Sequence, residues 1–162
     1  MAELLSTVLL TYSVFTIGSW WIDGLDRRWI VVAMGGAAIP DLVKVDLLVD
    51  ARVIEQTVGL PFSYTPVASI GGVAVVAGIV AMLFGTQWRR QAYAILFAAG
   101  GFSLLIDGAR VYADGYANFY LYPVWIRPPT PELFVSADPA VLGVALIVGA
   151  SVFSVDRWTA TG

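Results

Sequence analysis

The stretch AAIPDLVKVDLLVD, residues 37–50, decides the fold because it places a proline and then charged residues in an otherwise apolar run. Pro40 has no backbone donor, and its ring pushes the preceding Ile39 away from helical dihedrals. We therefore expect the helix that arrives from Trp29 to kink or end here, which frees backbone carbonyls beside Asp41. An ionisable group at membrane depth marks a functional site by default. The alternative is that the helix ends at Pro40 and that the carboxylates lie in water.

The composition around this stretch is that of an integral membrane protein. Of the 162 residues, 59% are hydrophobic and only 13% are charged, and the mean hydropathy is +0.80. This balance does not suit a soluble domain of this size. The net charge of -3 excludes the broad basic surface that binding to nucleic acid requires. Because the chain has no cysteine and no histidine, any chemistry must rest on carboxylates, hydroxyls, tyrosine, lysine or arginine.

The apolar runs predict an all-α fold, a single integral membrane domain formed by a bundle of about five transmembrane spans. The second span carries the proline break, and the fourth is expected to be interrupted at Gly100-Gly101. Residues 50–64 indicate an interfacial helix or loop, and residues 111–139 indicate an aromatic and proline-rich interfacial segment. The expected spans cover residues 2–22, 29–49, 66–86, 92–107 and 139–155.

Lysine and arginine near the span ends predict the orientation. Five spans place Arg27, Arg28, Arg89, Arg90 and Arg157 on one side, and Lys44, Arg52, Arg110 and Arg127 on the other. The slight excess on the first side predicts an external N-terminus and a cytoplasmic C-terminus in the cell membrane. The candidate aspartates and the tyrosine-rich segment then share the external face.

Pairs of glycines occur in three of the expected spans, at Gly35-Gly36, Gly71-Gly72 and Gly100-Gly101. Small residues allow helices to approach closely, and ordinary packing within the bundle is the interpretation that we favour. The amount of such surface is also compatible with a membrane-protein partner or a homo-oligomer.

The acidic residues admit several interpretations. Asp41 with Lys44, and Asp107 with Arg110, are each three residues apart, so each pair can form an internal ion pair or line a ligand site. A hydrolase built on Asp41 and Asp107 needs one raised and one ordinary carboxyl pKa in a closed pocket. A hard cation such as calcium or magnesium remains an alternative at Asp41, Asp46 and Asp107, although we expect neither a metal nor another cofactor.

Three tyrosines, Tyr112, Tyr116 and Tyr120, recur every four residues and would share one face of a helix. Such a face can stack on a lipid headgroup, a pigment or a quinone ring. We favour an aromatic belt at the level of the headgroups, because Gly115 and the prolines that follow argue against a long helix.

Several short motifs are spread over most of the chain: Asp26-Arg27-Arg28, Ile39-Pro40-Asp41-Leu42, residues 66–72, Leu104-Leu105-Ile106-Asp107 and Tyr122-Pro123-Val124-Trp125. Together they resemble the small membrane-bound metal-dependent hydrolase family. The resemblance implies that Asp41 and Asp107 occupy the family's acidic positions. It also implies a dismantled metal site, because Val43 replaces the second aspartate of the P-D-x-D motif and Ser103 replaces a histidine four residues before Asp107.

Three functions follow as hypotheses. The one we favour is a catalytically degenerate member of that family, a structural or accessory subunit of a membrane complex that contacts membrane lipid and a partner protein. The second is a residual carboxylate- or cation-dependent hydrolase that uses Asp41 and Asp107 on an amphiphilic substrate. The third is a small carrier or channel with the same two aspartates in its pathway, and its weakness is the absence of inverted halves in the sequence.

Overall fold

The computed structural model describes residues 2–124, 127–135 and 138–161. These residues form α-helices and short 3-10 helices joined by turns, which confirms the expected all-α fold. In chain order the helices are α1 (Ala2–Ser19), α2 (Arg27–Ala37), η1 (Pro40–Leu47), α3 (Ala51–Val58), η2 (Thr65–Ala68), α4 (Ile70–Ala81), α5 (Arg89–Gly108) and α6 (Pro139–Thr161).

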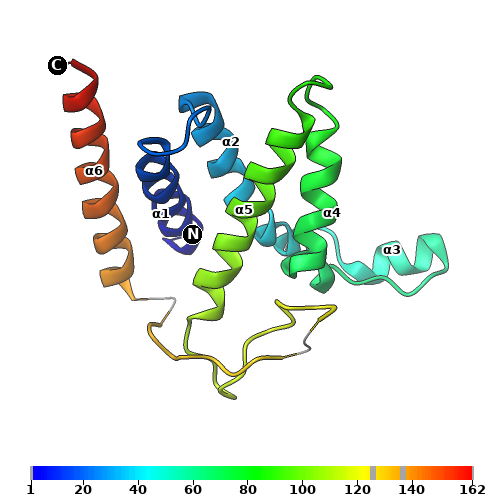
Figure 1. Cartoon of the computed structure of the whole chain (residues 1–162). Helices are drawn as coiled ribbons and strands as arrows, with labels where there is room; N and C mark the ends of the chain where they lie inside the picture. Colours follow the sequence, from blue (N-terminus) through cyan, green and yellow to red (C-terminus); the bar gives the residue numbers. More distant parts are fainter. Residues whose placement is uncertain (1, 125–126, 136–137, 162) are drawn as a thin grey trace.

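The longer helices pack in the spatial order α6, α1, α2, α5, α4 (Figure 1). The chain runs alternately up and down through them, so that residues 20–26 and 82–88 form turns at the upper end in Figure 1. The described parts of the connection between α5 and α6 lie at the lower end, and α3 projects sideways beside the lower end of α4. This arrangement separates two ends of the bundle, and the candidate site lies at the lower one.

The helix α2 begins and ends where its sequence dictates. The Asp26 side chain caps it by accepting hydrogen bonds from the backbone N–H groups of Arg28, at 3.0 Å, and Trp29, at 3.3 Å. The helix stops at Ala37, and the chain continues from Pro40 as the 3-10 helix η1. The expected break at Pro40 is therefore confirmed, and residues 29–49 do not form one continuous α-helix.

Two glycines allow the central helices to pack backbone against backbone. A Cβ atom on Gly36 of α2 would lie 2.9 Å from the carbonyl oxygen of Leu96 in α5. A Cβ atom on Gly100 of α5 would lie 2.6 Å from a methyl carbon of Val73 in α4. The expected packing role of these glycines is confirmed. The expected interruption at Gly100-Gly101 is wrong, because α5 is continuous, and packing against Val73 outweighs the low helix propensity of glycine.

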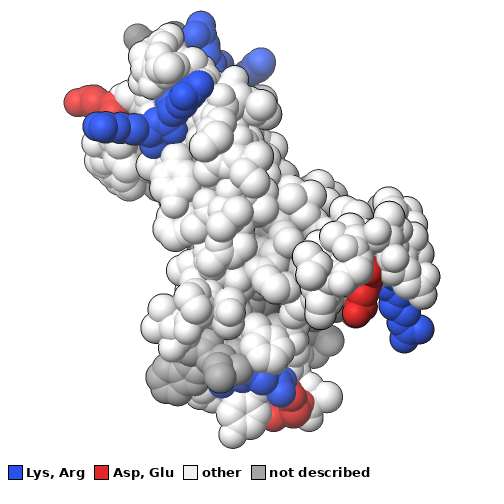
Figure 2. All heavy atoms as spheres, turned by 90° about the vertical axis from the view of Figure 1, so that its right-hand side faces the viewer, with Lys and Arg blue, Asp and Glu red and all other residues white. Residues whose placement is uncertain are grey.

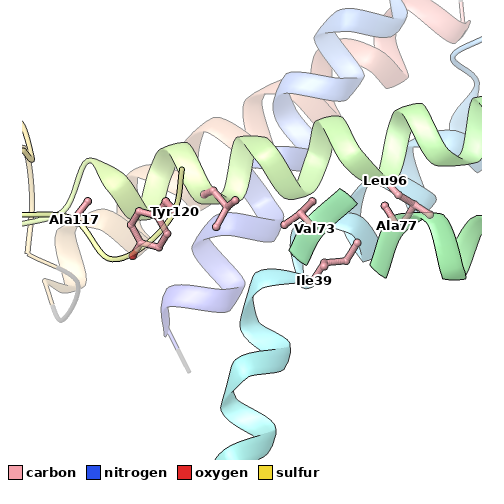
Figure 3. Close-up of a cluster of buried hydrophobic side chains, with 7 residues drawn as sticks. Ile39, Val73, Ala77, Leu96, Ala117 and Tyr120 are labelled. Carbon is pink, nitrogen blue, oxygen red and sulfur yellow. The ribbon is translucent and has the colours of Figure 1, made fainter. Parts of the chain in front are cut away.

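The largest buried cluster joins α4, α5 and the segments that flank them. Figure 3 shows Val73 and Ala77 of α4 opposite Leu96 of α5, with Ile39 from the chain after α2 beside them. The same cluster extends to Tyr120 in the connection after α5. The core therefore reaches from the middle of the bundle to its lower end and holds that connection in place.

Two of the described helices are long and apolar enough to cross a membrane. They are α5, with a mean hydropathy of 1.3, and residues Pro139–Thr159 of α6, with a mean hydropathy of 1.9. Leu4–Ser19 and Ile70–Ala81 are apolar but shorter. Of the five expected spans, two thus correspond to helices of membrane-crossing length, and α5 and α6 each extend beyond the span expected there.

The contact at Gly36 leads to a prediction with a matched control on the neighbouring residue. Gly36→Ala should lower the free energy of unfolding by about 1–3 kcal/mol, because the added methyl group meets the α5 backbone. Gly35→Ala should leave stability unchanged or raise it by up to about 1 kcal/mol, because nothing lies within 4 Å of that Cβ position and alanine favours the helix. Denaturation in detergent, followed by circular dichroism, checks both; equal stability of the two variants would contradict the close contact.

Candidate functional site

The site begins with an ion pair at the end of α5. Asp107 lies in the last turn of the helix, and Arg110 follows just after its end at Gly108. The Arg110 Nη2 atom lies 3.3 Å from Asp107 Oδ1, and both side chains are about four-fifths covered, with exposed fractions of 19% and 22%. The Arg110 Nε–H also donates to the backbone carbonyl of Asp107 at 3.4 Å. The expected pairing of Asp107 with Arg110 is therefore present, and it is mostly sheltered from solvent.

Two tyrosines of the following connection complete this cluster. The guanidinium of Arg110 donates to the Tyr112 hydroxyl at 3.1 Å and lies 5.6 Å from the centre of that ring. The hydroxyls of Tyr112 and Tyr120 share a hydrogen bond, and Tyr120 is only 5% exposed. These contacts run from the carboxylate of Asp107 through the cation to a buried phenol. We call Asp107, Arg110, Tyr112 and Tyr120 the α5-end cluster.

The environment of the α5-end cluster stabilises one charge state. Burial raises the pKa of Tyr120, the hydrogen bond with Tyr112 raises it further, and Arg110 opposes the shift. Burial alone would lower the pKa of Arg110, but Asp107 and the two tyrosine hydroxyls outweigh it, so that the pKa is raised. The arginine therefore stays cationic and Tyr120 stays neutral, which suits a permanent charge pair better than a proton-transfer relay.

Backbone hydrogen bonds hold the connection after α5 against two helix ends. The Val111 N–H donates to the backbone carbonyl of Phe134 at 2.9 Å, and the Leu133 N–H donates to the backbone carbonyl of Ala109 at 2.9 Å. The first turn of α4 donates from Ile70 to the carbonyl of Tyr120 at 2.8 Å. Because these donors and acceptors are paired, the described parts of the connection form a floor below α5.

A slot lies above this floor between α1, α5 and α6. Its volume is about 500 Å³, within the range of small-ligand sites. Ser6 and Thr7 of α1, Asp107 and Arg110, and Asp138 at the start of α6 provide its polar lining. The sequence did not lead us to predict Ser6, Thr7 or Asp138 as site residues. Ser6 and Thr7 belong to the hydroxyl residues scattered along the first apolar run, and Asp138 directly precedes the proline that begins α6.

Asp41 lies in a different setting from Asp107. It is at the start of η1, where its carboxylate lies 2.6 Å from Lys44 Nζ, as the spacing of the two residues predicts. Asp41 does not line the slot that Asp107 lines. Asp46, further along η1, accepts a hydrogen bond from the backbone N–H of Ala51 at 3.0 Å. The two aspartates proposed as catalytic are therefore each occupied by a separate ion pair.

Tyr116 is not part of the α5-end cluster. It is 51% exposed, and the guanidinium of Arg127 lies 6.0 Å from the centre of its ring. Arg127 also bonds the carboxylate of Asp114, and this bond lowers the pKa of Asp114. The spacing of four residues does not produce a helical face here, because Gly115 turns the chain with a φ of 69° and brings Tyr112 and Tyr120 together across the turn.

Among the described residues, no three aspartates or glutamates lie close enough together to hold a metal ion. Asp41, Asp46 and Asp107 belong to separate hydrogen-bond networks. A calcium or magnesium site takes six or more oxygen ligands, or several waters with one or two carboxylates. Of these carboxylates, Asp41 and Asp107 pair with cations of the chain itself, and Asp46 accepts a backbone hydrogen bond.

Comparison with family models, with curated proteins and with solved structures finds no match to this chain.

The α5-end cluster yields a prediction that separates Tyr112 from Tyr116. Tyr112→Phe removes hydrogen bonds to Arg110 and to the buried Tyr120 hydroxyl, so the free energy of unfolding should fall by about 1–3 kcal/mol. The control, Tyr116→Phe, alters a half-exposed side chain and should change the free energy of unfolding by less than about 0.5 kcal/mol. Denaturation curves of the two variants provide the measurement, and equal losses would show that the cluster contributes no net stability.

Proposed function

We propose that the protein is an integral membrane protein in which α5 and α6 cross the bilayer and α1, α2 and α4 pack beside them. The observation that supports this placement is the distribution of charge. In Figure 2, charged side chains gather at the two ends of the molecule and on the part that projects to the right, and the rest of the face between the two ends is uncharged. The 20 residues of α5 rise by about 30 Å, which equals the thickness of the hydrocarbon core of a bilayer, about 30 Å.

The side arm formed by η1 and α3 fits an interfacial position in this placement. Leu47 and Leu48 are 85% and 86% exposed, and they lead into α3. On the α3 helix, Ile54 and Val58 are one turn apart on one face, and Arg52 and Gln56 are one turn apart on the opposite face, as in helices that lie in the membrane interface. The arm projects beside the lower end of α4 (Figure 1). Its apolar side would contact acyl chains while its polar side stays in water.

We further propose that the protein is a non-catalytic accessory or structural subunit of a membrane complex. Two-carboxylate catalysis requires both groups at one reacting centre. Here Asp41 is paired with Lys44 and Asp107 with Arg110, and only Asp107 lines the slot. Ser103, at the position of a histidine in the hydrolase family that the sequence resembles, is 4% exposed. Together these observations favour a degenerate member of that family over a residual hydrolase.

The proposed orientation places the lower end outside the cell. At the upper end, Arg27 and Arg28 begin α2 and Arg89 and Arg90 begin α5, and Arg157 lies in the last turns of α6 at the same end. An excess of arginine and lysine favours the cytoplasmic side. The slot and the α5-end cluster would then open near the external leaflet, and the C-terminal end of α6 would be cytoplasmic.

The absence of cysteine permits a direct test of this placement. Single cysteines at Gln87, in the upper turn, and at Ala113, in the lower connection, are both at exposed positions. We expect a membrane-impermeant maleimide to label Ala113→Cys in intact cells and Gln87→Cys only after permeabilisation. Labelling of both variants from one side would contradict the proposed crossing, and release of the protein by alkaline carbonate would contradict membrane integration itself.

The accessory role has its own test. Extraction in mild detergent should yield a complex larger than the monomer, with a membrane-protein partner in fixed stoichiometry. Elemental analysis should give the same metal content for the wild type, Asp41→Asn and Asp107→Asn when divalent cations are added. A lone monomer with full function would overturn the accessory role. One equivalent of metal that is lost in either variant would instead support the residual hydrolase.

A further inference from the structure

The slot between α1, α5 and α6 is large enough for a small ligand. It is open on one side, and its volume of about 500 Å³ lies within the range of small-ligand sites. α6 packs on α1, and α1 also contacts α5, so that residues of these three helices line the slot. Within the proposed membrane placement, on which this inference rests, the opening faces the acyl chains of one leaflet.

The walls of the slot are suited to a hydrocarbon chain. Leu10 of α1, Leu105 and Ile106 of α5, and Val141 and Val144 of α6 supply aliphatic side chains from all three helices. Lipid chains are as apolar as these walls, so an alkyl chain in the slot is stabilised by van der Waals packing against them and not by leaving water. A ligand with an extended alkyl chain can therefore gain affinity along the whole length of the slot.

The polar end of the slot determines the chemistry of the ligand head. Asp107, Arg110 and Asp138 line it, so that two carboxylates face one guanidinium and the local charge is negative. The carboxylate of Asp138 accepts a hydrogen bond from the Ala140 N–H at 2.8 Å, which orients it at the start of α6. An anionic head would be repelled by this excess charge, whereas a cationic head that donates hydrogen bonds would be attracted.

We propose that the slot binds a single-chain amphiphile with an ammonium head. The alkyl chain lies between α1, α5 and α6, and the ammonium group lies beside Asp138 and the Asp107–Arg110 pair. A transmembrane helix of a partner is the wrong size for this space. Three helical turns, about 16 Å long and 10 Å across, occupy more than about 1,000 Å³, twice the slot volume of about 500 Å³.

The test uses the full chain in phosphatidylcholine nanodiscs and dodecylamine carrying a photoactivatable diazirine on its chain. We expect saturable labelling of slot residues such as Leu105 and Val141, and competition by unlabelled dodecylamine but not by dodecanoate, which has the same chain with an anionic head. Equal competition by dodecanoate would overturn the assignment of the head. Uniform labelling around α6, including the outward Ile147, would show annular lipid only and overturn the site.

Matched variants test the two halves of the site. Val144→Phe puts a ring into the slot and should abolish saturable labelling, whereas Ile147→Phe, at a position on α6 outside the slot lining, should leave it unchanged. Asp138→Asn should weaken competition by dodecylamine about two- to fivefold, as expected for one exposed charge. Its control, Glu132→Gln, alters an exposed carboxylate outside the slot lining and should have no effect.

These outcomes also distinguish the inference from the proposal on which it rests. Protein that resists alkaline carbonate but shows no saturable labelling would overturn the amphiphile site and leave the membrane placement intact. Protein released by carbonate would overturn the placement. Unchanged labelling in Val144→Phe, with the variant folded as judged by its circular dichroism, would exclude the slot as the site.

Discussion

The close packing of α2 against α5 is the constraint on which the rest of the structure depends. Gly36 lets the backbone of α2 approach the Leu96 carbonyl, and Gly100 lets α4 approach the opposite side of α5 through Val73. Three helices are thereby held at distances that larger side chains forbid. α5 is thus held at a defined position, and its final turn presents Asp107 at the lower end of the bundle.

The break at Pro40 fixes the position at which the helix α2 ends. It stops α2 and turns the chain into η1, where the pair of Asp41 and Lys44 forms within one short helix. The pair of Asp107 and Arg110 forms in the same local way at the end of α5. Each charge is neutralised by a residue three positions away, so neither carboxylate needs a distant partner. Among the described residues, the buried polar side chains are serines and threonines, and none is charged.

Features that depend on local chemistry could be predicted from the sequence, and features that depend on the relative placement of helices could not. Pro40 and the spacing of Asp107 and Arg110 act within a few residues, so the break and the ion pair were both foreseeable. The meeting of Tyr112 and Tyr120 requires the turn at Gly115, and the continuity of α5 requires Val73 on another helix. The slot requires the separation of α5 and α6, which no single segment encodes.

The packing of α6 on α1 joins the first and the last of the described helices. Arg27, at the start of α2, bonds Asp156 at 3.1 Å across 129 positions of the chain. Contacts of such long sequence separation form late, because the intervening chain must first be brought together. During synthesis, the face of α1 that carries Ser13 therefore waits uncovered until residues 139–161 have left the ribosome. The bundle is complete only when the first and the last helices have met. In an unfinished chain, the uncovered face of α1 is therefore the surface that chaperones and proteases of the membrane would meet first.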